Sequence, residues 1–166
     1  MTDCVLFLHG HQPFYNEEFI VKEIIRESYA PLLKQLLDLQ KEGHSFKINL
    51  SLTGSILQWF ERLNNKFLLN SIQELLKKDV LEIILSPFYH APLVFTDDGF
   101  IKEQFYHHHK MLKDMFNYEP RGFFPPELVF STHKNDLIQD LNIDYLLIEG
   151  SHEAFHTDDI SGLWSL

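Results

Sequence analysis

The chain has one cysteine, a shortage of basic residues and no long apolar run, and each of these features excludes a class of protein. Cys4 is the single cysteine among 166 residues, so no internal disulfide can form. No apolar stretch reaches membrane-spanning length, and the N-terminus lacks the basic flank and apolar run of a signal peptide. We therefore expect a soluble, cytoplasmic protein.

Acidic residues outnumber basic ones, 24 Asp and Glu against 14 Lys and Arg, and the formal net charge is −10. Nucleic acids and anionic membranes attract basic surfaces, so we expect neither as a partner. The sequence also lacks a phosphate-binding glycine loop, cysteine pairs and a G-x-S-x-G elbow. With 45% hydrophobic residues, the chain can bury one sizeable core, which predicts a single domain over residues 1–166.

Apolar runs of strand length alternate with helical patterns along the chain. Strands are predicted at 5–8, 46–52, 80–85, from about 121, and at 143–148. Helical patterns occupy 19–26, 31–43, 55–63, 67–78, 97–116 and, with Ser131 as a cap, 132–141. This order predicts an α/β fold with about five parallel strands and outer helices. Because the run at 5–8 is apolar throughout, it indicates a strand covered on both faces.

Histidine or glutamate follows three of these strands, each time beside proline. The motifs are HGHQP at 9–13, SPFYHAP at 86–92 and GFFPPE at 122–127. Parallel α/β folds collect their chemistry at the carboxyl ends of strands, so we predict that His9, His11, His90 and Glu127 cluster there. Each histidine alone could equally be a hydrogen-bonded structural residue. The recurrence of the pattern favours a site.

Glu127 follows two prolines. Each proline has a fixed φ and no N–H for a strand ladder, so the strand must stop and Glu127 must sit on a stiff elbow. Rigid placement suits a nucleophile or a general base. The alternative is a simple loop that brings Glu127 near the positive end of the next helix.

Aromatic side chains adjoin all three motifs: Phe14, Tyr15, Phe88, Tyr89, Phe123 and Phe124. Sugars are bound by such faces together with hydrogen bonds from His, Gln, Glu and Tyr, although the same aromatics could simply close the mouth of a barrel. Trp59 has apolar neighbours at helical spacing and is predicted to lie in the core. Consecutive helical residues point about 100° apart, so the His run at 107–109 indicates a partly solvated helix face rather than a metal site.

Together, the three motifs resemble those of glycoside hydrolase family 57. The segments SYAPLL at 28–33 and SLTGS at 51–55 also resemble that family's intervening segments, so the resemblance covers nearly the whole chain. It implies a distorted seven-stranded (β/α) barrel, of which this chain would form an N-terminal, partial (β/α)7-type portion. It further implies retaining hydrolysis or transfer at α-glycosidic bonds of an α-glucan or related oligosaccharide, without a metal cofactor.

The resemblance also implies roles for individual residues. Glu127 falls on the family's nucleophile, His9 and His11 on paired histidines beside the first sugar subsite, and His90 on a site position after the third strand. The expected substrate-binding residues are His9, His11, Gln12, Tyr89, His90 and Phe124. Many relatives carry tryptophan where Phe124 stands, so an aromatic face remains but the indole N–H donor is lost.

A retaining glycosidase also needs a second carboxylic acid about 5 Å from the nucleophile. In this family it is an aspartate on a strand well beyond that of Glu127, so we expect it to be absent before Leu166, with Glu149, Asp158 and Asp159 as the remaining candidates. A half-barrel would leave the first and fifth strand edges unpaired and an apolar surface exposed. That predicts a homo-oligomer or a missing C-terminal segment.

Two other functions stay open. A polysaccharide deacetylase-like hydrolase would use His9, His11 and His90 as metal ligands and Glu127 as base or fourth ligand. A non-catalytic half-barrel would only bind sugar. The Gln-Pro pair after His11 and the lack of aspartate in the three motifs favour the glycosidase over the deacetylase.

Overall fold

The computed structural model describes residues 5–139, 141–148 and 163–165. It is a mixed α/β structure whose chain forms two compact units, the first ending at Glu82 and the second beginning at Ile83. The predicted alternation of strands and helices is confirmed for these residues, and each unit carries its own set of parallel strands.

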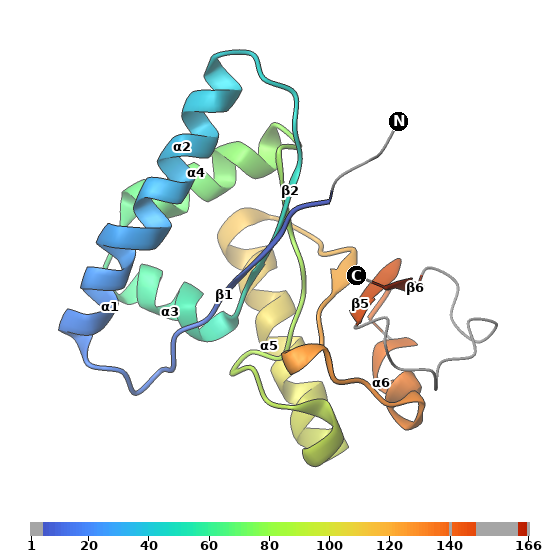
Figure 1. The fold of residues 1–166 in the computed structure, drawn as a ribbon. Coiled ribbons are helices and arrows are strands. Elements are labelled where there is room, and N and C mark those ends of the chain that lie inside the picture. The colour runs from blue at the N-terminus through green and yellow to red at the C-terminus, as the bar shows by residue number, and fades with distance from the viewer. Residues whose placement is uncertain (1–4, 140, 149–162, 166) are drawn as a thin grey trace. The chain divides into compact units, whose positions relative to one another are not determined.

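The N-terminal unit contains the strands β1 (Phe7–Gly10) and β2 (Ile48–Leu52) and the first two residues of β3 (Leu81–Ile83), and the sheet has the order β1-β2-β3. β1 and β2 run parallel, with Gly10 opposite Leu52 (Figure 1). The predicted covering of the first strand on both faces is wrong for its beginning, because Val5 and Leu6 are 62% and 48% exposed. These residues precede β1, at the end of the strand order rather than in its middle.

After β1 the chain forms three helical segments that join one another without a break. They are α1 (Glu18–Ile24), a π-helical turn η1 (Ile25–Tyr29) and α2 (Ala30–Lys41). The predicted helix start near Pro31 is confirmed by α2, which begins at Ala30, but the sequence did not predict that no break separates α2 from α1. Pro31 has no N–H to donate, and the wider turn before it, in which the Ala30 N–H bonds the Ile25 carbonyl, lets the chain continue as a helix.

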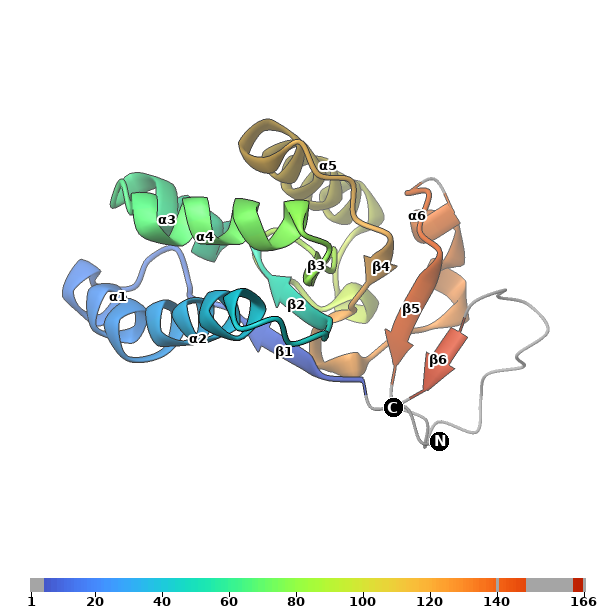
Figure 2. The same cartoon turned by 90° about the horizontal axis from the view of Figure 1, so that it is seen from above.

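The remaining helices of this unit are α3 (Gly54–Arg62) and α4 (Lys66–Lys77). α2 and α4 lie side by side (Figure 2). Asn65 caps α4, because its side chain accepts a hydrogen bond from the Leu68 N–H. Ile56, Phe60 and Ile72 are fully buried, and the prediction that Trp59 belongs to the core is confirmed at 2% exposure.

The C-terminal unit contains β4 (Gly122–Phe123), β5 (Tyr145–Ile148) and β6 (Leu163–Ser165), parallel and in that order (Figure 2). β6 is one strand more than the sequence predicts. A further parallel bridge joins Leu85 to Phe123, so the segment after β3 extends the pairing beside β4.

The helices of this unit are α5 (Asp98–Phe116) and α6 (Asn135–Gln139), with short 3-10 turns η2 (Leu93–Phe95), η3 (Pro126–Leu128) and η4 (Thr132–Lys134). Asp97 caps α5 by accepting from the N–H groups of Gly99 and Phe100, as the acidic pair before that glycine suggests. The predicted helix over 132–141 is shorter, since a 3-10 turn replaces its first residues.

Candidate active site

The paired histidines of the first motif lie at the carboxyl end of β1, as predicted. His9 is in the strand and His11 follows it, and their rings stack with centroids 6.4 Å apart and planes 14° from parallel. Residues two apart on an extended chain point to the same side, which explains the stacking. His9 is exposed and His11 is half-buried.

Two hydroxyl groups at the start of α3 hold the His11 ring. Its Nδ1 lies 3.0 Å from Thr53 Oγ1 and 3.4 Å from Ser55 Oγ, and these two oxygens are themselves 3.0 Å apart. Thr53 occupies the N-cap position of α3, yet its side chain makes no capping hydrogen bond. Burial lowers the pKa of His11 below its ordinary value, which favours the neutral imidazole in this hydroxyl network.

Gln12 is linked to two neighbours. Its Oε1 accepts a hydrogen bond from Asn16 Nδ2 at 2.9 Å, and its side chain also hydrogen-bonds Tyr29. Burial raises the pKa of Tyr29 to about 12, although the Gln12 hydrogen bond acts in the opposite direction. The Tyr29 ring packs against Gly10, where an added Cβ would lie only 2.9 Å from Tyr29 Cε1, so Gly10 permits this close approach.

The second and third motifs start from neighbouring backbone positions in the C-terminal unit. The Leu85 N–H donates to the Gly122 carbonyl at 2.9 Å, and the Phe124 N–H donates to the Leu85 carbonyl at 2.8 Å. These two bonds bring the loop that begins at Ser86 and the turn that begins at Phe124 side by side. The strand pairing itself therefore juxtaposes the two motifs.

The side chains of His90 and Glu127, which follow these two paired segments, lie close to each other. His90 Nε2 lies 3.6 Å from Glu127 Oε1, and the His90 ring stacks on Phe124 at 6.1 Å between centroids. The His90 side chain is 11% exposed, whereas that of Glu127 is 75% exposed. A carboxylate is thus presented to solvent beside a largely covered imidazole.

Both of these residues have a left-handed backbone. φ is 60° at His90, 60° at Glu127 and 59° at Leu128. L-residues other than Asn and Asp rarely adopt this conformation, which costs roughly 1–2 kcal/mol each, and such strain concentrates at functional sites. The predicted stiff elbow is observed, because Glu127 lies in the 3-10 turn that follows Pro125 instead of at the start of an α-helix.

The other predicted substrate-binding residues differ in exposure. Tyr89 is 49% exposed, while Phe124 is 6% exposed beneath the His90 ring. Phe14 and Tyr15, which flank the first motif, are 49% and 88% exposed. The candidate acids Glu149, Asp158 and Asp159 lie outside the described residues.

The prediction of a partly solvated face for the histidine run is wrong for its middle residue. His107 is exposed and His109 is half-buried, but His108 is fully buried and its Nδ1 lies 2.7 Å from the Ser86 carbonyl. His108 sits seven residues after Ile101, on the apolar face of α5. That spacing was the signal that could have placed it, together with Gln104 four residues earlier.

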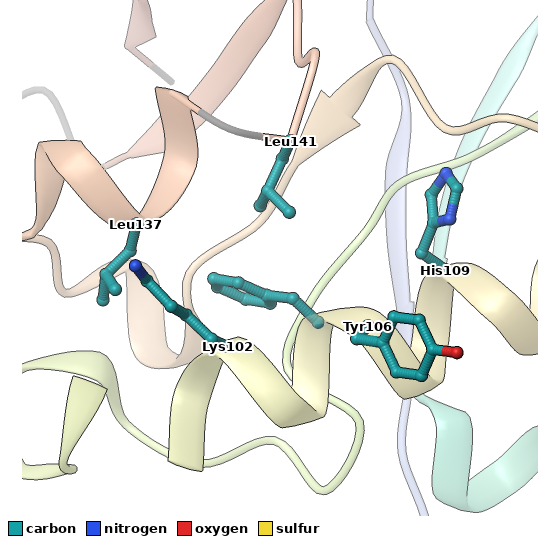
Figure 3. Close-up of a pocket in the computed structure, with 6 residues that line it drawn as sticks. Lys102, Tyr106, His109, Leu137 and Leu141 are labelled. Carbon is teal, nitrogen blue, oxygen red and sulfur yellow. The ribbon is translucent and has the colours of Figure 1, made fainter. Parts of the chain in front are cut away.

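A pocket of about 280 Å³ lies between α5 and the segment that contains Leu137 and Leu141 (Figure 3). It is lined by Lys102, Phe105, Tyr106, His109, Leu137 and Leu141. None of the predicted site residues contributes to it. Its lining is mainly apolar, so it differs in chemistry from the strand-end motifs.

Comparison with known proteins decides the family. The sequence profile of glycosyl hydrolase family 57 matches residues 5–165. The chain belongs to glycosyl hydrolase family 57. The predicted resemblance is therefore confirmed over nearly the whole chain, although the family match does not itself assign a role to any residue.

The chain is similar to proteins named as alpha-amylases and 4-alpha-glucanotransferases. An alpha-amylase of Pyrococcus horikoshii is 27% identical over 87% of this chain and 22% of its own length. A 4-alpha-glucanotransferase of Thermococcus kodakarensis is 26% identical over 92% of this chain and 22% of its own length. In structure, the 4-alpha-glucanotransferase of Thermococcus litoralis superposes with a TM-score of 0.79 at 22% identity, over 87% of this chain and 22% of that one. The chain thus spans about a fifth of the length of these relatives.

No helix in the described part of the chain is both long and apolar enough to cross a membrane.

Proposed function

We propose that this chain supplies the nucleophile-bearing part of a retaining family 57 enzyme that hydrolyses or transfers α-glucans, with Glu127 as the nucleophile. The observation that carries the proposal is the exposed Glu127 carboxylate, held on a left-handed backbone 3.6 Å from His90. Family membership and the amylase and glucanotransferase names of the relatives support an α-glucan as the substrate class.

The proposed reaction has two displacement steps. A carboxylate oxygen of Glu127 forms a bond to the anomeric carbon while the bond from that carbon to the leaving oxygen breaks, and a general acid protonates the leaving oxygen. The same group then takes a proton from water or an acceptor hydroxyl, whose oxygen bonds to the anomeric carbon and releases Glu127. We place that acid outside the described residues, in Glu149, Asp158 or Asp159, in a further segment, or in a second copy of the chain.

The other motif residues are proposed to bind the sugar. His90, largely covered and in contact with Phe124, orients the carboxylate, and Tyr89 adds an exposed phenol side chain. His9, His11 and Gln12 of the N-terminal unit are likewise proposed to bind sugar, and residues 1–166 are proposed to be a single domain, the N-terminal portion of a (β/α)7-type barrel. Phe14 and Tyr15 offer exposed aromatic faces next to them.

Replacing Glu127 by glutamine tests the proposal, because the amide keeps the shape and removes the nucleophile. We expect turnover of an α-glucan by the active protein to fall by at least about 1,000-fold while binding of the same glucan persists. Glu103→Gln is the matched control, since Glu103 is exposed on α5 outside the motifs, and its activity should be unchanged. Full activity in Glu127→Gln would refute the assignment.

Two further measurements separate the proposed chemistry from the alternatives. Azide should restore reaction in Glu127→Ala with an activated α-glucosyl fluoride and give the inverted glucosyl azide, which requires a lost covalent nucleophile. Activity that survives dialysis against a chelator fits the glycosidase. Activity lost on chelation and restored by zinc would favour the deacetylase-like alternative.

A further inference from the structure

α5 carries two buried polar side chains on a face that is otherwise apolar. Gln104 is 2% exposed and His108 is fully buried, among Ile101, Phe105 and Leu112. Residues four apart lie one above the other on a helix, so the two side chains share one direction. An apolar side chain at either place would pack without the desolvation cost of a polar group, so both polar groups need an explanation.

Both side chains hydrogen-bond the loop that carries His90. Gln104 Oε1 accepts from the Tyr89 N–H at 2.9 Å, and His108 Nδ1 contacts the Ser86 carbonyl at 2.7 Å. A carbonyl only accepts, so His108 donates through Nδ1–H. The two bonds reach the first and fourth residues of the five-residue stretch from Ser86 to His90.

The same loop contains a turn that sets the backbone of His90. The His90 N–H donates to the Pro87 carbonyl at 2.9 Å, and φ at His90 is 60°. Phe88, between the two bonded residues, is 5% exposed and meets the His108 ring edge-on at 6.3 Å. A strained conformation persists only where the surroundings over-determine it, and these contacts do so.

We propose that Gln104 and His108 are positioning residues, which fix the loop from Ser86 to His90 on α5 and thereby hold the His90 imidazole against Phe124 and Glu127. The proposal rests on the proposed function only for its catalytic consequence. Its structural content, that these two side chains place the His90 ring, stands on the contacts alone.

The test uses NMR to compare ring contacts in the unaltered chain with those in the variants Gln104→Met and His108→Phe. Gln104→Met removes the acceptor at similar length, and His108→Phe keeps the ring without its donor. We expect the nuclear Overhauser effects between the His90 and Phe124 rings to be lost or to weaken several-fold in both variants. The Phe105–Phe123 contact, at 5.2 Å in the core of the same unit, should persist and reports an intact fold.

Matched controls isolate the hydrogen bonds. His108→Asn keeps a donor near the place of Nδ1 and should retain the His90–Phe124 signal. His44→Phe makes the same substitution as His108→Phe at an exposed position and should also retain it. An unchanged His90–Phe124 signal in Gln104→Met and His108→Phe, with the Phe105–Phe123 signal intact, would overturn the proposal.

A measurement on the unaltered chain decides the matter if a variant does not fold. The Tyr89 amide, bonded to the buried Gln104, should exchange with solvent at least about 100-fold more slowly than an unprotected amide. Exchange at the unprotected rate would overturn the proposal.

Activity then separates this inference from the proposed function. In the active protein, both variants should lower kcat for an α-glucan at least about tenfold with little change in KM, and His108→Asn should recover most of it. If the ring contact is lost without loss of activity, the positioning stands and the proposed role of the His90–Glu127 pair fails.

Discussion

The two units hold their strand-end motifs by different physical means. In the N-terminal unit, His11 is held by side-chain hydrogen bonds to Thr53 and Ser55, and neither His9 nor His11 has a positive φ. In the C-terminal unit, His90 and Glu127 both have left-handed backbones, supported by prolines before each residue and by α5.

This difference indicates how the motif of each unit can respond when a ligand binds. A side-chain network costs little backbone energy and can adjust its geometry when a ligand arrives. A strained elbow has one geometry, which suits the placement of a nucleophile but requires stability from elsewhere in the fold. The strain therefore lies in the unit to which the proposed covalent chemistry belongs.

The largest expected effect on stability is that of replacing one glycine in each unit: Gly10 in the first motif and Gly122 in the third motif. In Gly122→Ala the new Cβ would lie 2.3 Å from Tyr145 Cζ, and in Gly10→Ala it would lie 2.8 Å from Leu52 Cδ2. We expect a loss of about 1–3 kcal/mol in each, larger for Gly122→Ala because a whole ring on the paired strand must move. Urea denaturation measures this, with Gly99→Ala as a control whose Cβ meets only Asp97 Oδ1 at 3.1 Å. Equal stability of all three variants would contradict the close packing.

The next effect tests the hydroxyl network in the N-terminal unit. Thr53 is fully buried, and Thr53→Val removes its hydroxyl from both His11 and Ser55 without changing the size of the side chain. We expect a loss of about 1–2 kcal/mol in the free energy of unfolding, because buried polar atoms lose a partner. Thr96→Val, which removes an exposed hydrogen bond to the Pro92 carbonyl, should cost less than about 0.5 kcal/mol. Similar losses for both would place Thr53 outside any network.

The role of Thr53 also shows what a sequence pattern can and cannot predict. The Thr-Gly-Ser run after an apolar segment predicts a strand followed by a helix start, and β2 and α3 meet there. The pattern suggests a cap, yet the Thr53 hydroxyl turns to a histidine 42 residues earlier in the chain. Local spacing reveals elements, whereas the partner of a side chain depends on strand pairing that spacing does not encode.

In the candidate site, too, the sequence predicts local features but not the finer backbone geometry. Prolines before Glu127 predict a stiff elbow, because proline restricts the backbone locally. The left-handed φ at His90 and Glu127 was not predictable, because no glycine or asparagine marks these positions. The burial of His108 departs from the prediction for a related reason: its helical spacing from Ile101 places it on the apolar face of α5, and three consecutive histidines do not show which of them faces the core.

A smaller effect, of opposite sign, tests the strain in the C-terminal unit. Glu127→Gly removes an exposed side chain and relieves the left-handed backbone. We expect a gain of about 0.5–1 kcal/mol, the relief of strain minus the entropy that glycine adds to the unfolded chain. Thermal unfolding measures it, and Glu127→Gln should leave the stability unchanged. A less stable Glu127→Gly would mean that the elbow is not strained.

The smallest effect is a pH dependence in the N-terminal unit. Burial lowers the pKa of His11 below its ordinary value of 6.5, so the unfolded chain takes up a proton at this residue before the folded chain does. The stability from neutral His11 is fully present above pH 6.5 and is lost as the pH falls through 6.5 toward the lower pKa of the folded state. Below that pKa the loss is complete, because both states are then protonated.

Unfolding free energies measured between about pH 7 and pH 5 should therefore fall less steeply in His11→Asn than in the unaltered chain. His44→Asn is the matched control, because it makes the same substitution at an exposed position. An identical slope in His11→Asn would show that His11 titrates alike in both states.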